Sequence, residues 1–149
     1  ARRLPDDHRP RHRALLPSPG LRARRGPDLE TDYNWVRDRD LDYFADVEHR
    51  YTVPCYPNVS VGWDSTPRCH PESEFAPVGY PFSETISGNT PARFGEALAR
   101  ICALVKDRPE AERIVTINSW NEWTEGSYLE PDDLNGMGYL EAIARIKGG

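Results

Sequence analysis

The sequence lacks the features that mark several protein classes. Its three cysteines, Cys55, Cys69 and Cys102, include no Cys-x-x-Cys pair, so it offers neither a disulfide framework nor a zinc knuckle. No apolar run approaches the roughly 18 residues of a membrane span, and the basic start lacks the apolar segment of a signal peptide. The run Gly136-Met-Gly138 is too short for a dinucleotide-binding loop. We therefore expect no metal, no cofactor and no membrane span, and both a cytoplasmic and an exported location stay open.

An excess of positive charge is also absent from most of the chain. Residues 1–30 carry a net charge of +4, whereas residues 31–149 carry −9, which gives the whole chain −5. An acidic body argues against a nucleic-acid surface there. The length of 149 residues suffices for one domain. It falls short of the about 250 residues of a complete (β/α)8 barrel, so a barrel would make this chain a fragment.

The first 30 residues differ from the rest of the chain. They are rich in Arg and Pro and show no periodicity, which is typical of a disordered tail or a spurious start. The alternative is a basic arm that binds nucleic acid or phosphate. We favour the tail, because aromatic residues do not interleave the arginines and Asp6 and Asp7 interrupt the positive charge. Residues 31–149 then form the domain.

The pattern of the domain predicts alternating strands and helices. We expect a short helix over 41–49, a strand over 51–61 made irregular by Pro54 and Pro57, and a long Pro- and Ser-rich loop over 62–89. Thr90-Pro91 should start a helix that ends before Pro109. A strand buried on both faces should follow over 114–118, and a last helix should begin near residue 138. This order predicts a parallel α/β fold. The side chains expected to face the core are Phe94, Leu98, Ile101, Leu104, Val105, Tyr139, Leu140, Ile143 and Ile146.

Carboxylates and aromatic rings crowd the exit of the predicted 114–118 strand. Cleavage of a glycosidic bond needs two carboxyl groups, and Glu122 and Glu125 are the candidates. Three residues apart, they share a face only if the chain turns, which Gly126 permits. Sugar rings pack on flat apolar surfaces, and amides bond to hydroxyls. The candidate substrate-binding residues of these kinds are Trp63, Trp120, Trp123, Tyr128, Asn118 and Asn121.

A purely structural interpretation competes with this site. Acidic residues after a strand often cap a helix, and tryptophans are more often part of a core than a sugar platform. The concentration of both kinds at one strand exit favours function. For Asp64 and Arg68 the two interpretations are balanced: they bind sugar or orient a carboxylate, or they form a local ion pair that pins the loop. His70 is a loop residue, because no spaced partner set for a metal accompanies it.

The run Asn118-Ser-Trp-Asn-Glu-Trp-Thr-Glu-Gly-Ser-Tyr-Leu-Glu-Pro-Asp132 strongly resembles the signature of glycoside hydrolase family 99-like proteins, in particular the WbsX-type branch. Two further segments are similar and occur in the same order, Pro57–Asp64 with Thr66-Pro67-Arg68, and Asn89–Phe94. The resemblance covers residues 31–149. It implies that this chain is the C-terminal half of a (β/α)8 barrel of the TIM type.

The resemblance also implies roles for individual residues. Glu122 would be the base that acts on the substrate 2-hydroxyl, and Glu125 the general acid/base at the glycosidic oxygen, through an anhydro-sugar. Tyr128 and Glu130 would line the sugar site. Thr124 stands where the endo-mannosidase branch usually has His, so mannan specificity does not follow.

Several functions remain open, and hydrolysis is favoured. The carboxylate pair fits a retaining hydrolase of α-linked glycans, although WbsX-type proteins are often labelled glycosyltransferases of polysaccharide biosynthesis. The sequence is also compatible with a non-catalytic carbohydrate-binding remnant and with the product of a pseudogene. The expected partners are an oligo- or polysaccharide and the missing N-terminal half of the barrel. Because a half-barrel exposes open strand edges, we expect the isolated chain to be inactive.

Overall fold

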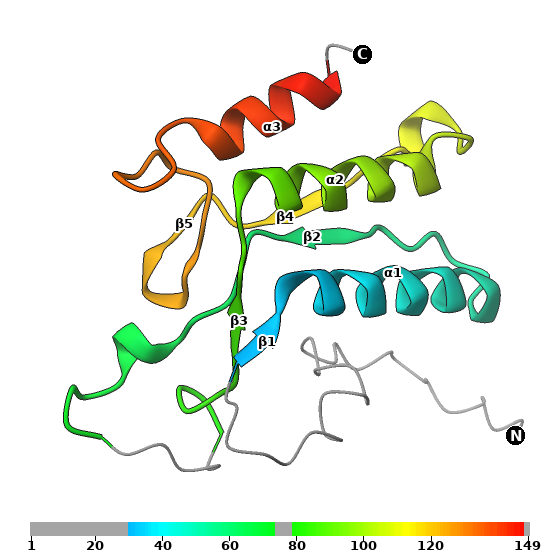
Figure 1. Cartoon of the computed structure of the whole chain (residues 1–149). Coiled ribbons are helices and arrows are strands. Elements are labelled where there is room, and N and C mark those ends of the chain that lie inside the picture. Colours follow the sequence, from blue (N-terminus) through cyan, green and yellow to red (C-terminus); the bar gives the residue numbers. More distant parts are fainter. Residues whose placement is uncertain (1–29, 74–78, 148–149) are drawn as a thin grey trace, which may run out of the picture.

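The computed structural model describes residues 30–73 and 79–147 (Figure 1). The expected Arg- and Pro-rich tail lies outside these residues except for Glu30, which begins the first strand. The elements are β1 (Glu30–Asp32), α1 (Tyr33–Arg50), β2 (Asn58–Ser60), η2 (Thr66–Arg68), β3 (Thr85–Ser87), α2 (Pro91–Val105), η3 (Glu110–Glu112), β4 (Thr116–Asn118), β5 (Asn121–Glu122), η4 (Trp123–Glu125), β6 (Ser127–Tyr128) and α3 (Gly138–Lys147).

The longer strands pair in parallel and skip one strand in sequence. β1 pairs with β3, and β2 pairs with β4. The Ile86 N–H donates to the Trp63 carbonyl at 2.7 Å, which joins β3 to the segment that follows β2. In a (β/α)8 barrel each strand lies next to its neighbours in sequence. The pairing among the described residues differs from that order, so the barrel stays a prediction.

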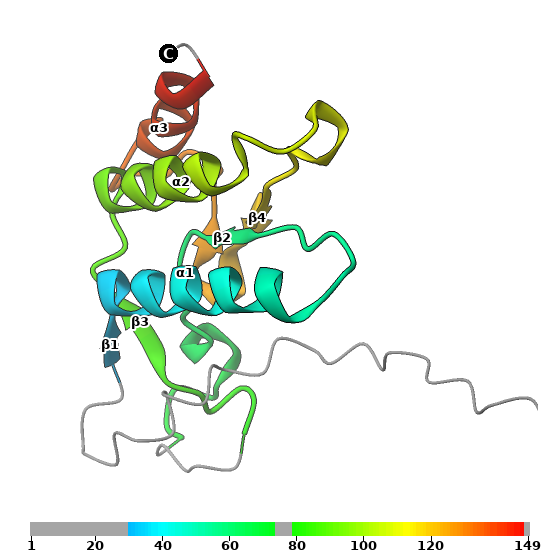
Figure 2. The same ribbon diagram turned by 90° about the vertical axis from the view of Figure 1, so that its right-hand side faces the viewer.

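Two of the helices, α1 and α2, begin at capping side chains. Asp32 Oδ1 accepts from the Asn34 N–H at 2.9 Å and so caps α1, while Asp32 Oδ2 pairs with Arg93 at 2.9 Å. The start of α1 is thereby tied to the first turn of α2. Thr90 caps α2, with Pro91 at the first helical position, as the sequence predicts. Figures 1 and 2 show α2 between α1 and α3, with β2 and β4 passing beside it. None of the helices in the described ranges combines the length and the apolar character that a membrane crossing requires.

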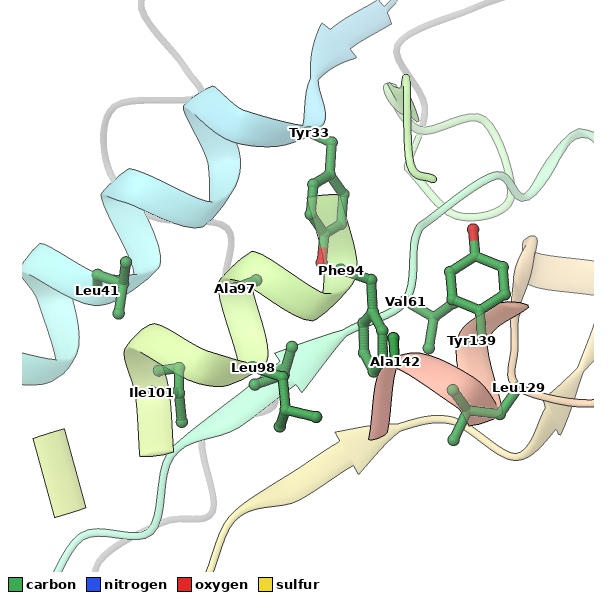
Figure 3. Close-up of a cluster of buried hydrophobic side chains, with 11 residues drawn as sticks. Tyr33, Leu41, Val61, Phe94, Ala97, Leu98, Ile101, Leu129, Tyr139 and Ala142 are labelled. Carbon is green, nitrogen blue, oxygen red and sulfur yellow. The ribbon is translucent and has the colours of Figure 1, made fainter. Parts of the chain in front are cut away.

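The core lies where α2 meets α1, β2 and α3 (Figure 3). Phe94 is fully buried, and its ring meets the edge of Tyr139 with centroids 5.6 Å apart. Leu98 is 5% exposed, whereas Leu104 is 41% exposed, so the inward position predicted for Leu104 is wrong. Leu104 lies ten positions after Phe94, which places it about 80° from Phe94 around the helix, at the edge of the buried stripe. The buried cluster consists of Tyr33, Leu41, Val59, Val61, Phe94, Ala97, Leu98, Ile101, Leu129, Tyr139 and Ala142.

Several expected boundaries are wrong. The first helix begins at Tyr33 rather than Leu41, because Asp32 caps it and Tyr33 is anchored by its hydroxyl, which donates to the Ser60 carbonyl at 2.6 Å. The 51–61 strand shrinks to β2, since Pro54 and Pro57 have no N–H to donate. The loop over 62–89 contains β3.

The strand predicted over 114–118 is also corrected. It is limited to β4 and is only partly buried, and Ile114 just before it is 46% exposed. Within the described residues β4 has one strand neighbour, β2, so it lies at the edge of a two-stranded pair and not in the middle of a sheet.

Candidate active site

A small hairpin carries both candidate carboxylates. After β4 ends at Asn118, β5 and β6 pair antiparallel, and η4 with Gly126 forms the turn between them. Gly126 adopts the left-handed conformation at φ +58° and closes the four-residue loop, residues 123–126, between the two strands. The chain therefore turns between Glu122 and Gly126, which is the condition under which Glu122 and Glu125 share a face.

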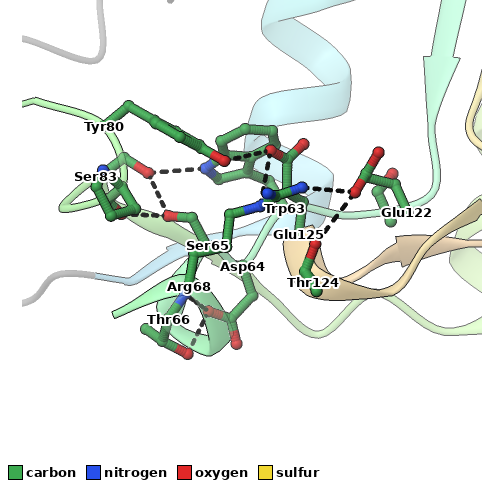
Figure 4. A network of polar contacts seen from close by, with 12 residues as sticks. Trp63, Asp64, Ser65, Thr66, Arg68, Tyr80, Ser83, Glu122, Thr124 and Glu125 are labelled. Carbon is green, nitrogen blue, oxygen red and sulfur yellow. Dashed lines mark hydrogen bonds and ion pairs between the residues drawn. The ribbon is translucent and has the colours of Figure 1, made fainter. Parts of the chain in front are cut away.

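One guanidinium brings the two glutamates together. Arg68 Nη2 lies 2.7 Å from Glu122 Oε1, and Arg68 Nε lies 3.3 Å from Glu125 Oε1 (Figure 4). Arg68 comes from η2, which follows β2, while the glutamates follow β4. Because β2 and β4 run parallel, the loops after them leave the same edge. The backbone ties these loops as well, since the Asp64 N–H donates to the Glu125 carbonyl at 2.7 Å.

Two hydroxyls complete the contacts of the glutamates, and the sequence assigned no role to either. Tyr80 Oη donates to Glu125 Oε1 at 2.9 Å, and Thr124 Oγ1 donates to Glu122 Oε1 at 3.1 Å. Desolvation raises the pKa of the Tyr80 phenol, and its hydrogen bond to Glu125 raises that pKa further, while the Arg68 charge opposes both effects. Tyr80 lies within the Pro- and Ser-rich loop over 62–89, and the length of this loop was the available signal, because loops of that length in a compact domain are usually functional.

The aromatic candidates fall into two groups. Trp63 lies near Tyr80, with ring centroids 6.4 Å apart, on the side of Arg68 and Glu125. Trp123 stacks on Tyr128 with centroids 3.8 Å apart and an interplanar angle of 17°. The Trp123 indole N–H also donates to Glu130 Oε2 at 2.7 Å. This bond links the hairpin loop to Glu130, which follows the hairpin. Trp120 is exposed, and its carbonyl accepts from the N–H groups of Leu129 and Glu130.

The remaining candidates have mostly structural contacts. Asp64 Oδ1 accepts from the N–H and the hydroxyl of Thr66 at 2.9 and 2.7 Å. Arg68 forms ion pairs with Glu122 and Glu125. This arrangement agrees with the interpretation in which Arg68 orients a carboxylate. The Asn118 amide donates to Ser127 Oγ at 3.0 Å at the base of the hairpin, and Asn121 is exposed.

The described ranges contain no group of three His, Cys, Asp or Glu side chains arranged to hold a metal ion. His70 sits in a loop, where its Nδ1 accepts from the Glu72 N–H at 3.3 Å.

Replacing Gly126 by alanine is expected to destabilise the protein by about 2–4 kcal/mol, because a left-handed alanine costs about 1–2 kcal/mol and a clash adds to it. A Cβ at Gly126 would lie 2.9 Å from Asp64 Cβ. The matched control is Gly136→Ala, where φ is +54° and no atom lies within 4 Å of the added Cβ. Urea unfolding of both variants measures the difference. Equal losses would mean that the Gly126–Asp64 contact carries no energy.

The comparisons with known proteins agree on one family. The model of the family described as "Glycosyltransferase WbsX" matches residues 26–143. Two curated proteins named WxcX and described as uncharacterized, from two strains of Xanthomonas campestris pv. campestris, are 35% identical over 133 residues and 37% identical over 128 residues. Each alignment covers 83% of this chain and 17% of the relative, so the chain spans about a sixth of their length. No solved structure matches.

Proposed function

Since the chain belongs to the WbsX family, we propose that it supplies the carboxylate part of an active site that acts on oligo- or polysaccharides. The observation that carries this proposal is the shared contact of Glu122 and Glu125 with Arg68, beside the rings of Trp63 and Tyr80. Two carboxylates held side by side next to apolar rings fit a sugar whose hydroxyls and ring face must both be bound.

The reaction we favour is hydrolysis of an α-glycosidic bond with retention. Glu122 takes the proton of the substrate 2-hydroxyl, whose oxygen forms a bond to C1 while the bond from C1 to the leaving oxygen breaks. Glu125 gives its proton to that leaving oxygen. Water then adds at C1 and opens the anhydro ring, as Glu125 takes a proton from the water and Glu122 returns one to the 2-oxygen. Protons and bonds balance over the two steps.

We also propose that the chain forms the C-terminal half of a (β/α)8 barrel. The parallel direction of the strand pairs and the helices that follow β1, β3 and β4 support this fold, whereas the order of the pairs, which skips one strand, does not. So does the position of the candidate site, because Arg68 and both glutamates follow the carboxyl ends of strands, where barrel enzymes build active sites.

Glycosyl transfer is the second candidate, and the description of the matching family as a glycosyltransferase favours it. In that case one glutamate would act as the base that deprotonates an acceptor hydroxyl, and a nucleotide-sugar would be the donor. A binding module that lacks turnover would use Trp63 and the exposed Trp120 and Trp123, without either glutamate.

The deciding experiment incubates the complete polypeptide that contains this chain with a panel of α-linked glycans, with and without nucleotide-sugars. Reducing ends released without any donor support hydrolysis. Chain extension that depends on a donor contradicts hydrolysis and supports transfer. Sugar binding with no product in either condition contradicts both enzymatic proposals and leaves the binding module.

A further inference from the structure

We propose that Tyr80 is a positioning residue of the active site, whose hydroxyl holds Glu125 in one orientation so that the second carboxylate oxygen faces the substrate. The inference rests on the proposed catalytic role of Glu125. It concerns a residue 45 positions away in sequence, on the segment that connects η2 to β3.

All the donors around Glu122 and Glu125 contact the Oε1 atom of the carboxylate in question. Glu125 Oε1 receives the Tyr80 hydroxyl at 2.9 Å and lies 3.3 Å from Arg68 Nε. Glu122 Oε1 receives Arg68 Nη2 at 2.7 Å and the Thr124 hydroxyl at 3.1 Å. Among residues 30–73 and 79–147, no side chain donates a hydrogen bond to either Oε2 atom. Each carboxylate is thus held by one oxygen and leaves the other available to a substrate.

The segment that follows Tyr80 is held by a chain of hydrogen bonds. Ser65 is completely buried, and its hydroxyl donates to the Pro81 carbonyl. Ser83 Oγ lies 2.8 Å from Ser65 Oγ, and it accepts from the Trp63 indole N–H at 2.9 Å. With Ser65 donating to Pro81, the Ser83 hydroxyl donates to Ser65, so each group in the chain has a partner. These contacts fix the segment after Tyr80 to the extension of β2 (Figure 4).

The Tyr80 ring has two neighbours in the site. Its centroid lies 6.4 Å from that of Trp63, and the Arg68 guanidinium carbon lies 5.9 Å from it, a distance at which a cation attracts an aromatic face. The hydroxyl also remains a donor at neutral pH, because desolvation, the bond to Glu125 and the charges of Glu125 and Glu122 raise the pKa of the phenol against the effect of Arg68. A tyrosine held in this way orients the carboxylate rather than being oriented by it.

The activity test compares Tyr80→Phe with Tyr43→Phe in the complete polypeptide. Both tyrosines are 58% exposed, but Tyr43 lies on α1 away from the site, so the pair controls for loss of a surface hydroxyl. Phenylalanine keeps the ring that contacts Trp63 and Arg68. We expect Tyr80→Phe to lower kcat by about 10- to 100-fold, which is the size of one hydrogen bond to a charged group. KM should change less than about twofold, because the substrate does not touch the hydroxyl.

A second test needs no activity. The ionisation of the tyrosines of this chain is followed by ultraviolet absorbance, with and without Glu125→Gln. If the contact forms, Glu125→Gln lowers the pKa of one phenol toward its usual value, because it removes the adjacent negative charge. When Glu125→Gln is made in the Tyr80→Phe protein, it should leave the pKa values of the remaining tyrosines unchanged.

The outcomes separate this inference from the proposed function. An unchanged kcat in Tyr80→Phe, with product release abolished in Glu125→Gln, overturns the positioning role and leaves the catalytic proposal standing. If Glu125→Gln leaves the pKa of every tyrosine unchanged, the contact between Tyr80 and Glu125 is overturned. Absence of product from any glycan overturns the proposed function, while the titration still decides whether Tyr80 holds Glu125.

Discussion

Glu125→Gln is expected to reduce the release of product from a glycan by about 10²- to 10⁴-fold, the usual contribution of a general acid/base. Glutamine keeps the shape of the side chain and can still accept from Tyr80 and Arg68 through its amide oxygen, but it cannot give or take a proton. Sugar binding should therefore persist while turnover is lost. The measurement is the initial rate of reducing-end formation at saturating glycan, together with the dissociation constant of the glycan.

Glu141→Gln is the control for this prediction. Glu141 is an exposed glutamate on α3, outside the site, and its substitution should leave the rate unchanged. A Glu125→Gln protein that turns over glycan at the rate of the unmodified protein would contradict an acid/base role. If turnover survives Glu125→Gln but is lost in Glu122→Gln, the proton transfers would have to be reassigned to Glu122 and water.

Leu98→Ala is expected to lower the free energy of unfolding by about 2–5 kcal/mol, the usual cost of cutting a buried leucine to alanine. Leu98 lies on the inward face of α2 and is 5% exposed. The cavity left behind would be walled by the neighbours of α2 in the core, which α1, β2 and α3 contribute. Urea unfolding followed by circular dichroism gives the free energy for each variant.

The same helix supplies a matched control, Leu104→Ala. Leu104 is 41% exposed, so its truncation removes less buried surface and should cost less than about 1 kcal/mol. Alanine is a good helix former at both positions, so helix propensity does not bias the comparison. Equal costs for the two variants would show that the buried face of α2 differs from the one described.

Local signals account for the parts of the fold that the sequence predicted. The helices α2 and α3 were found because apolar residues recur at helical spacing and Thr90-Pro91 marks a start. The first half of α1 was missed, because it buries little besides Tyr33 and its face between residues 34 and 40 is mostly polar or charged. The strand pairing could not be predicted, since each pair joins segments that are distant in sequence.

The site was predicted to the extent that its residues share one segment. Glu122 and Glu125 lie three residues apart, and the turn that unites them follows from Gly126. The contact of Arg68 with the glutamates was one of two balanced interpretations, because the choice depends on how two loops meet. Beyond the length of its loop, no sequence signal indicated the hydrogen bond between Tyr80 and Glu125, since this bond depends on where the tertiary fold places a loop without periodicity.

The close contact between the two loops also limits how this family can evolve. The Asp64 N–H donates to the Glu125 carbonyl, and Gly126 packs against Asp64 so closely that a single methyl group would collide. An insertion or deletion between Val61 and Arg68, or between Asn118 and Tyr128, would shift one partner along the other and separate Arg68 from the glutamates. Changes in loop length during divergence should therefore accumulate outside these two segments. Members of the family that keep the length of one segment should also keep the length of the other.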